Sequence, residues 1–218
     1  MDNPIFTIEE ASREKSKASI MIEGLSGKGK SGLALIIAKV LSGDWEHVGA
    51  IDTENRSLKL FAGIPSTLEE PYGKFKIGNL DPEIGFKPTN YLTYRDVLLK
   101  AGCTTIIEDS ISHAWQYKGG VLDLVTAAQS KQTNKSDKYG AWRDEEVQRE
   151  KNELLQLIRD PRCHVITTVR VKEKFTPETG DDGKTFIKSL GEQQIMQDDI
   201  KYEPDLVLHM IRAGNAKV

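Results

Sequence analysis

One run of small and basic residues carries the clearest chemistry in this sequence. Residues 24–31 read Gly-Leu-Ser-Gly-Lys-Gly-Lys-Ser and match the pattern G-x-x-x-x-G-K-[ST] of a phosphate-binding loop. Glycines let such a loop turn tightly enough for backbone N–H groups to surround a phosphate, while its lysine reaches phosphate oxygens and its serine ligates Mg²⁺. The sequence therefore predicts a site for ATP and Mg²⁺ formed by Gly24, Leu25, Ser26, Gly27, Lys28, Gly29, Lys30, Ser31 and Gly32.

The segments on either side of this loop have the character that the motif requires. Residues 19–22 form a short apolar run, as expected of a buried strand. Residues 31–41 are apolar on nearly all sides, as expected of a helix packed against a sheet, and Gly43 is expected to end that helix. A strand, a phosphate-binding loop and a helix in this order indicate a nucleotide site.

Two neighbouring acids end another apolar run, Ile106-Ile107-Glu108-Asp109. Successive side chains of a strand point to opposite faces of the sheet, so Glu108 and Asp109 cannot both face the nucleotide. An acid at the end of such a strand can hold Mg²⁺ through water, opposite Ser31. The sequence thus predicts one acid that helps to bind the metal and one that points elsewhere.

The general base of a hydrolysis reaction then has to come from another segment. In many ATPases a catalytic glutamate follows the metal-binding aspartate, whereas here the order of the two acids is reversed. Glu54 is the best candidate, because it lies just beyond the neighbouring predicted strand at residues 48–52. The alternative for Glu54 is an exposed loop carboxylate, and Asp52 is interpreted as a cap on the turn.

Apolar segments alternate with helix-like segments along the chain, which predicts an α/β fold with a mostly parallel sheet covered on both faces. We expect a single domain over residues 1–218 and a hairpin about residues 180–183. Thr89 or Asn90 is expected to cap a helix that runs to Lys100. The other expected strands are 74–77, 103–109, 164–169 and 205–211, and the other expected helices are 56–62, 119–129 and 141–160.

Composition sets looser bounds on the function. The 218 residues contain neither an apolar span of about 20 residues nor a signal-peptide pattern, which predicts a cytoplasmic protein with no membrane partner. Cys103 and Cys163 are expected to be reduced core thiols, and the four histidines lack the spacing of zinc ligands. The net charge of −3 argues against a strongly basic nucleic-acid binder that acts as a monomer.

Two polar stretches interrupt the alternation of strands and helices. Residues 129–140 and 172–188 are both expected to emerge near the carboxyl edge of the parallel sheet, where ligands bind. Each stretch taken alone can be a solvated loop. Together they are candidates for a surface that binds a polymer, with the basic side chains of Lys131, Lys135, Lys138, Lys172, Lys174, Lys184 and Lys188 and with Tyr139, Trp142 and Phe175 available to stack on bases.

In order and spacing, these segments resemble the RecA-like P-loop NTPase core, with a β-hairpin extension toward its C-terminus. More narrowly, the chain resembles phage-encoded AAA-type nucleotide-binding proteins, which include short RecA-like single-strand annealing recombinases. The narrower resemblance rests on Thr-Val-Arg-Val-Lys-Glu-Lys-Phe at 168–175 and Gln-Asp-Asp-Ile-Lys-Tyr-Glu-Pro-Asp-Leu-Val-Leu at 197–208. The sequence departs from the RecA-like pattern because it shows no separate DNA-binding domain after the last predicted strand.

The resemblance implies roles for individual residues. Glu54 matches the glutamate that activates water, Asp109 the acid that binds Mg²⁺, and Arg170 the polar residue that senses the γ-phosphate and is linked to the following DNA-binding loop. It also implies a homo-oligomer with ATP between subunits. A basic residue of a neighbouring subunit then completes the site, and Lys184 or Lys188 is the candidate.

The function predicted from the sequence is ATP hydrolysis coupled to binding of single-stranded DNA, in phage recombination or replication. Lys30, Glu54 and Arg170 are the expected catalytic residues, and Ser31 and Asp109 the expected metal ligands. An alternative is a nucleotide-dependent switch or loader whose partner is a protein, such as a helicase or a packaging component. A small-molecule kinase is disfavoured because the sequence shows no arginine-rich lid.

Overall fold

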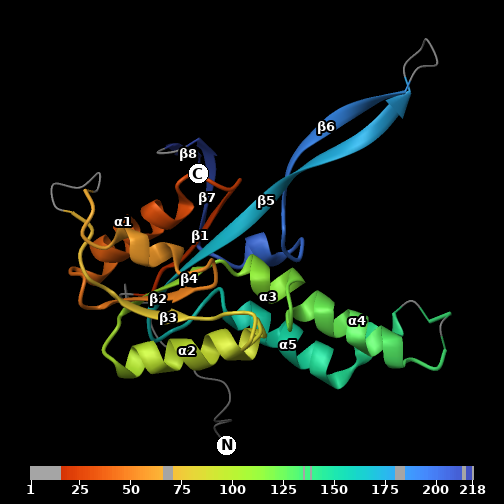
Figure 1. The fold of residues 1–218 in the computed structure, drawn as a ribbon, viewed down its shortest axis with the longest axis horizontal. Helices are drawn as coiled ribbons and strands as arrows, with labels where there is room; N and C mark the ends of the chain where they lie inside the picture. Colours follow the sequence, from red (N-terminus) through yellow and green to blue (C-terminus); the bar gives the residue numbers. More distant parts are fainter. Residues whose placement is uncertain are drawn as a thin grey trace, which may run out of the picture.

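The structure of this chain is a computed structural model that describes residues 16–65, 71–134, 136–137, 139–179, 185–212 and 215–217. Its core is a mostly parallel sheet with helices on both faces, as the sequence predicts (Figure 1). Within the described parts of the chain, no helix is both long enough and apolar enough to cross a membrane.

The strands of the sheet lie in the order β3-β2-β4-β5-β1-β7-β8, and β6 pairs with β5 outside this path. The strands β3, β2, β4, β5, β1 and β7 run parallel to one another, while β8 is antiparallel to β7. Their bounds are Ser19–Gly24 for β1, Val48–Asp52 for β2, Lys76–Asn79 for β3, Thr105–Asp109 for β4, His164–Thr179 for β5, Thr185–Gln194 for β6, Leu206–Arg212 for β7 and Asn215–Lys217 for β8.

Two apolar clusters fill the space between the sheet and its helices. On one face, helix α1 (Lys30–Ser42) and the short helix η1 (Ser57–Phe61) pack against strand residues such as Ile22 and Ile107. On the other face, the adjoining residues Met21 and Ile106 pack against the remaining helices. These are α2 (Pro88–Lys100), α3 (Ser112–Gln116), α4 (Val121–Lys131), η2 (Gly140–Arg143), α5 (Glu145–Gln156) and η3 (Ile200–Tyr202).

The thiols of Cys103 and Cys163 are both free and buried, which confirms the expectation of reduced core cysteines. Each lies just before a strand rather than in it, since β4 begins at Thr105 and β5 at His164. Cys103 and Cys163 belong to the cluster of apolar side chains that supports α2 and α5. Both residues therefore act as small apolar core residues.

Some expected element bounds are wrong, and side-chain hydrogen bonds explain two of them. Helix α2 begins at Pro88, because proline suits the first helical position, and Thr89 donates to Glu150 instead of acting as a cap. Helix α5 begins at Glu145 rather than 141, because the Asp144 carboxylate accepts the N–H groups of the first turn. The short elements α3 and β8 have no counterpart among the expected ones.

Strand β5 continues far beyond its expected end at residue 169 and forms a two-stranded arm with β6. Residues up to Val169 are mostly buried between β4 and β1, whereas those from Lys172 onward are largely exposed and pair with β6 only. The arm projects away from the body of the domain (Figure 1). The predicted turn at residues 180–183 lies outside the described residues.

A buried ion pair ties the second face of the sheet to its helices. The Arg95 guanidinium on α2 donates to Oε1 of Glu108 on β4, at 3.1 Å from Nε and 2.5 Å from Nη2. Both side chains are almost fully buried. Arg95 also donates to the backbone carbonyls of Gln156 and Leu157 at the end of α5. Burial raises the pKa of Glu108, while Arg95 acts in the opposite direction.

We expect Arg95→Met to lower the free energy of unfolding by about 3–5 kcal/mol, because it leaves the Glu108 carboxyl buried without its partner. The double variant Arg95→Met/Glu108→Leu should recover a large part of this loss, since neither charge then remains. Urea denaturation followed by circular dichroism measures both values. A loss below about 1 kcal/mol in the single variant would contradict a structural role for the pair.

Candidate active site

The phosphate-binding loop connects β1 to α1 in a conformation that only glycine adopts easily. Gly27 and Gly29 have φ angles of 75° and 89°, in the left-handed region, and Gly24 has a φ of 155°. Gly24 also passes close to β7, because a Cβ atom built on it would lie 2.9 Å from Cβ of Met210. Conformation and space therefore both call for glycines in this loop.

The loop encloses a cavity of about 270 Å³ at the amino end of α1. Backbone N–H groups at a helix amino end and their aligned dipoles favour a phosphate. Besides the loop residues, this cavity is lined by Glu54, Phe61 and Arg170. The predicted loop residues that line it are Ser26, Gly27, Gly29, Lys30, Ser31 and Gly32.

Lys30 lies at the first position of α1, and its side chain folds back into the loop. Its ammonium donates to the backbone carbonyls of Gly24 at 2.9 Å and Leu25 at 3.0 Å. Desolvation lowers the pKa of Lys30, and the nearby carboxylates of Glu54 and Asp109 act in the opposite direction. The ammonium is thus placed beside the cavity by acceptors of the loop itself.

The two expected metal ligands lie in direct contact. The Ser31 hydroxyl donates to Oδ2 of Asp109 at 2.6 Å, and the Thr168 hydroxyl on β5 donates to Oδ1 of the same carboxylate. Oxygen donors of this kind suit Mg²⁺, so Ser31 and Asp109 fit its site, directly or through water. When bound, Mg²⁺ would neutralise part of the phosphate charge.

Asp109 is buried, and its environment changes its acidity. Desolvation, with a smaller contribution from the Glu54 charge, raises the pKa of Asp109 to about 6, while hydrogen bonds from Ser31 and Thr168 act in the opposite direction. Glu108 projects to the other face of the sheet, toward Arg95. The expectation that only one of these two acids faces the phosphate loop is therefore confirmed.

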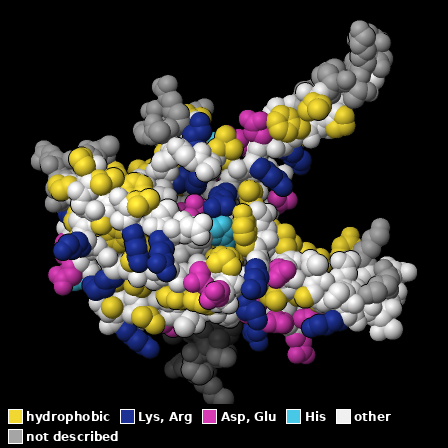
Figure 2. All heavy atoms as spheres, viewed as in Figure 1, with side chains coloured by type: hydrophobic (Ala, Val, Ile, Leu, Met, Phe, Trp, Pro, Cys, Tyr) yellow, Lys and Arg dark blue, Asp and Glu magenta, His cyan; other side chains and the backbone are white. Residues whose placement is uncertain are grey.

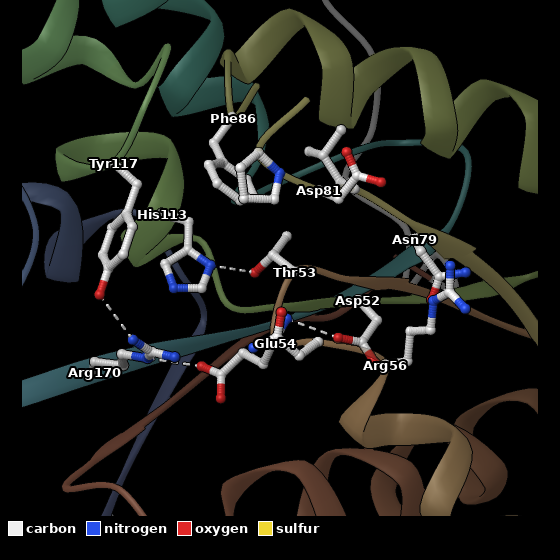
Figure 3. A pocket seen from close by; sticks show the side chains of 13 residues that line it. Asp52, Thr53, Glu54, Arg56, Asn79, Asp81, Phe86, His113, Tyr117 and Arg170 are labelled. Atoms are coloured by element: carbon white, nitrogen blue, oxygen red, sulfur yellow. Dashed lines mark hydrogen bonds and ion pairs between the residues drawn. The ribbon is translucent and has the colours of Figure 1, made fainter. Parts of the chain in front are cut away.

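Glu54 and Arg170 form an ion pair at the edge of the phosphate cavity. The distance from Nε of Arg170 to Oε1 of Glu54 is 2.7 Å. Arg170 lies opposite Gly24 in the β1–β5 register, which brings it to the start of the loop. Its Nη1 also donates to the Tyr117 hydroxyl at 3.1 Å, and its guanidinium lies 5.9 Å from the centre of the Tyr117 ring (Figure 3).

A capped turn places Glu54 beside the loop. The Asp52 carboxylate at the end of β2 accepts the N–H of Glu54 at 2.7 Å and that of Leu58 at 2.9 Å. Asn55 and Arg56 between them have φ angles of 55° and 63°. This geometry confirms the interpretation of Asp52 as a cap. It also explains why Glu54 lines the phosphate cavity instead of pointing freely into solvent.

Several residues of the site were not anticipated from the sequence. Thr168 lies on the strand two positions before Arg170, so the alternation of side chains along β5 was a signal that could have found it. Phe61 and His113 lie in the short helices η1 and α3, Tyr117 directly follows α3, and no motif marks them. The His113 ring lies 2.6 Å from the Thr53 hydroxyl, and burial lowers the pKa of His113 to about 4.

The predicted DNA-contacting residues lie on two separate extensions. Lys131 ends α4, and Tyr139 lies just before η2, whereas Lys172, Lys174 and Phe175 are exposed on the arm. The two extensions diverge from the carboxyl edge of the sheet (Figure 1). Trp142 packs against Trp115, with ring centroids 6.3 Å apart. Lys135, Lys138 and Lys184 lie outside the described residues, and Lys188 lies in β6.

A glycine-rich loop between a buried strand and a helix, with the acid that ends another parallel strand of the same sheet against its serine, defines a P-loop nucleotide-binding protein of the α/β class. The family model described as "AAA domain" matches residues 16–218, and the chain belongs to this family. A search of curated proteins finds no match. Among solved structures, a KaiC-like protein from the hyperthermophilic archaeon Pyrococcus horikoshii OT3 is similar, with 13% identity, a TM-score of 0.40, and coverage of 84% of this chain and 83% of that one.

We expect Glu54→Gln to retain ATP binding and to lose most of the turnover, by about 100-fold, because the amide keeps the shape of the side chain but is not a base. Glu108→Gln is the matched control, since it changes a carboxyl on the opposite face of the sheet. Single-turnover hydrolysis and fluorescent-nucleotide binding measure the two steps. If turnover stops in Glu108→Gln and continues in Glu54→Gln, the assignment of the base is wrong.

The raised pKa of Asp109 predicts a pH dependence of metal binding. A metal ligand must be deprotonated, so protonation of Asp109 below about pH 6 should weaken Mg²⁺ binding, by about tenfold between pH 7.5 and pH 5. Titration of Mg²⁺ into protein saturated with a non-hydrolysable ATP analogue measures this change. Asp109→Asn should show only the smaller change that comes from the phosphates of the analogue. An identical pH profile in both proteins would contradict the assignment.

Proposed function

We propose that this protein hydrolyses ATP and that its nucleotide state controls binding of single-stranded DNA. The observation that carries the first part is the convergence of Lys30, Glu54 and Arg170 from separate segments on one cavity, with Asp109 bound to Ser31 at its wall. A cation, a base, a metal-binding acid and a second cation are the groups that phosphoryl transfer to water requires.

Glu54 and Arg170 change partners in the proposed reaction. In the structure, Arg170 is bound to Glu54, so a cation contacts the carboxylate that is proposed to orient water. The γ-phosphate of ATP offers Arg170 a second anion of higher charge. Arg170 then shares its charge with the phosphate, and Glu54 becomes free to orient the attacking water. Lys30 leaves its carbonyl partners for the phosphate oxygens in the same step.

The proposed DNA function is supported by the two lysine-bearing extensions at the carboxyl edge. The net charge of −3 means that a single copy has little overall attraction for a polyanion. We therefore propose that several copies assemble and align these extensions along one strand. The proposal of phage recombination or replication rests on the sequence resemblance alone. The proposal of a cytoplasmic location rests on the sequence pattern, which shows neither an apolar span of about 20 residues nor a signal-peptide pattern.

The arm favours the alternative of a protein partner. Phe175, Ile187 and Leu190 on this arm are exposed, at 55%, 75% and 53% of their surface. A two-stranded ribbon is marginally stable by itself, so apolar side chains along it are suited to packing against another protein surface. This observation keeps a nucleotide-dependent switch or loader as the second candidate.

We expect Lys30→Ala to abolish ATP hydrolysis and to weaken ATP binding at least several-fold in a folded protein, because it removes the ammonium of the loop. Lys59→Ala on η1 is a control, since Lys59 is exposed and lies outside the site. Phosphate release is measured with and without single-stranded DNA of about 50 nucleotides, long enough to span several copies. Turnover in Lys30→Ala at the level of the unaltered protein would overturn the ATPase proposal. Absence of DNA binding at low salt with ATP would favour the protein-partner candidate.

A further inference from the structure

A second cavity adjoins the phosphate cavity on the other side of the Glu54–Arg170 ion pair. It has a volume of about 510 Å³, and Glu54 and Arg170 line both cavities. It opens between the carboxyl ends of β2 and β3 and the helix α3, in the region drawn in Figure 3. Its size lies within the range of sites for small ligands. Neither Lys30 nor Asp109 lines it, so the proposed hydrolysis leaves it unassigned.

One end of this cavity is aromatic. The rings of Phe86, His113 and Tyr117 form a cluster with centroid distances of 4.2 Å for His113 and Tyr117 and 5.1 Å for Phe86 and His113. Phe86 and His113 are buried, whereas 40% of Tyr117 is exposed. Tyr117 is therefore the ring of the cluster with surface to offer to a planar ligand. The two rings behind it and the Arg170 contact hold it in place.

The other end of the cavity offers a cation. Arg56 is exposed and forms no ion pair with any other residue that the structure describes. A free guanidinium at a cavity wall suits an anionic group of a ligand, because it can donate charge-assisted hydrogen bonds to it.

The carboxylates of this cavity already have partners. Asp52 accepts two backbone N–H groups, and Asp81 accepts those of Glu83 at 3.0 Å and Ile84 at 3.3 Å. Glu54 is bound to Arg170. Among the charged side chains that line this cavity, Arg56 is thus the one without a hydrogen-bonded or ionic partner in the described part of the chain, and it suits an anionic group such as a phosphate.

We propose that this cavity binds a nucleotide unit, with its planar base on Tyr117 and its phosphate on Arg56. The unit is either a free nucleotide or one residue of a single-stranded nucleic acid. In the second case, the inference rests on the proposed function and gives it a base-binding site beside the ATP site. Because Arg170 touches both Tyr117 and Glu54, occupation of this cavity and hydrolysis are coupled through one guanidinium.

Binding of two probes tests this proposal, with the phosphate loop saturated by ADP and Mg²⁺. Calorimetry measures binding of dTMP, and fluorescence anisotropy measures binding of an oligodeoxythymidylate of about 20 nucleotides, enough to cover a typical site. Tyr117→Ala should raise Kd at least about fivefold, the lower limit for loss of one stacked base. Arg56→Gln should also raise Kd at least about fivefold, because it removes a charge-assisted hydrogen bond to the phosphate. Tyr117→Phe keeps the ring and should bind with less than half of that increase.

Tyr202→Ala and Arg149→Gln are matched controls, because both residues are exposed and neither of them lines this cavity. Circular dichroism establishes that each variant is folded. If Tyr117→Ala and Arg56→Gln bind both probes as tightly as the controls do, the cavity is not the site. If neither probe binds to the unaltered protein, the inference is overturned as well.

The two probes distinguish a free nucleotide from a single strand of nucleic acid as the ligand. Variant-sensitive binding of the oligomer, together with much weaker binding of dTMP, supports a single strand as the ligand. Variant-sensitive binding of dTMP without binding of the oligomer supports a free nucleotide, and the DNA part of the proposed function then fails while this inference stands. Oligomer binding that the variants do not change leaves the DNA function in place and overturns the cavity as its site.

Discussion

The alternation of side chains along β4 is the constraint on which both the site and the core depend. Glu108 and Asp109 are neighbours, so the pleat sends one carboxyl to each face of a buried sheet. Each carboxyl then needs its own compensation in a medium where charge is costly. Arg95 supplies it on one face, while Ser31 and Thr168 supply hydrogen bonds on the other. One acid thus stabilises the helical layer, and the other remains available to a metal.

The Glu54–Arg170 pair gives each of these two partly exposed charges a partner within the protein. Without this ion pair, the two charged side chains at the cavity wall would have only water and dissolved ions as partners. Their pairing at 2.7 Å is short, but both groups are partly exposed, so screening by water keeps the interaction modest. A phosphate can therefore compete for Arg170. The same guanidinium contacts Tyr117, which extends the effect of this competition into the neighbouring cavity.

The arm formed by β5 and β6 is not shaped by burial in the core of the domain. Within the sheet, β5 is specified by burial on both faces, and its residues are apolar or small. Beyond Val171 the strand has only β6 as a neighbour, and its side chains alternate without a buried face. Figure 2 shows apolar and charged side chains mixed along this projection. These side chains gain little stabilisation from packing within the domain, so they are available to contact another molecule.

The sequence by itself determined the phosphate loop, the parallel α/β core and the fact that Glu108 and Asp109 point to opposite faces of the sheet. These features follow from local rules: glycine conformations, the apolar pattern and the two-residue period of a strand. The position of Glu54 could also be predicted, because Glu54 follows a strand whose carboxyl end lies at the same edge of the parallel sheet as the phosphate loop.

Only the tertiary structure decided which groups are partners. Arg95 and Glu108, like Arg170 and Glu54, are joined across loops and helices whose lengths carry no periodic signal. The second cavity is a product of the same assembly, since β2, β3, α3 and β5 each contribute to its wall. Contacts between distant segments depend on how the elements pack, and packing is set by the summed shapes of many side chains, which no single motif records.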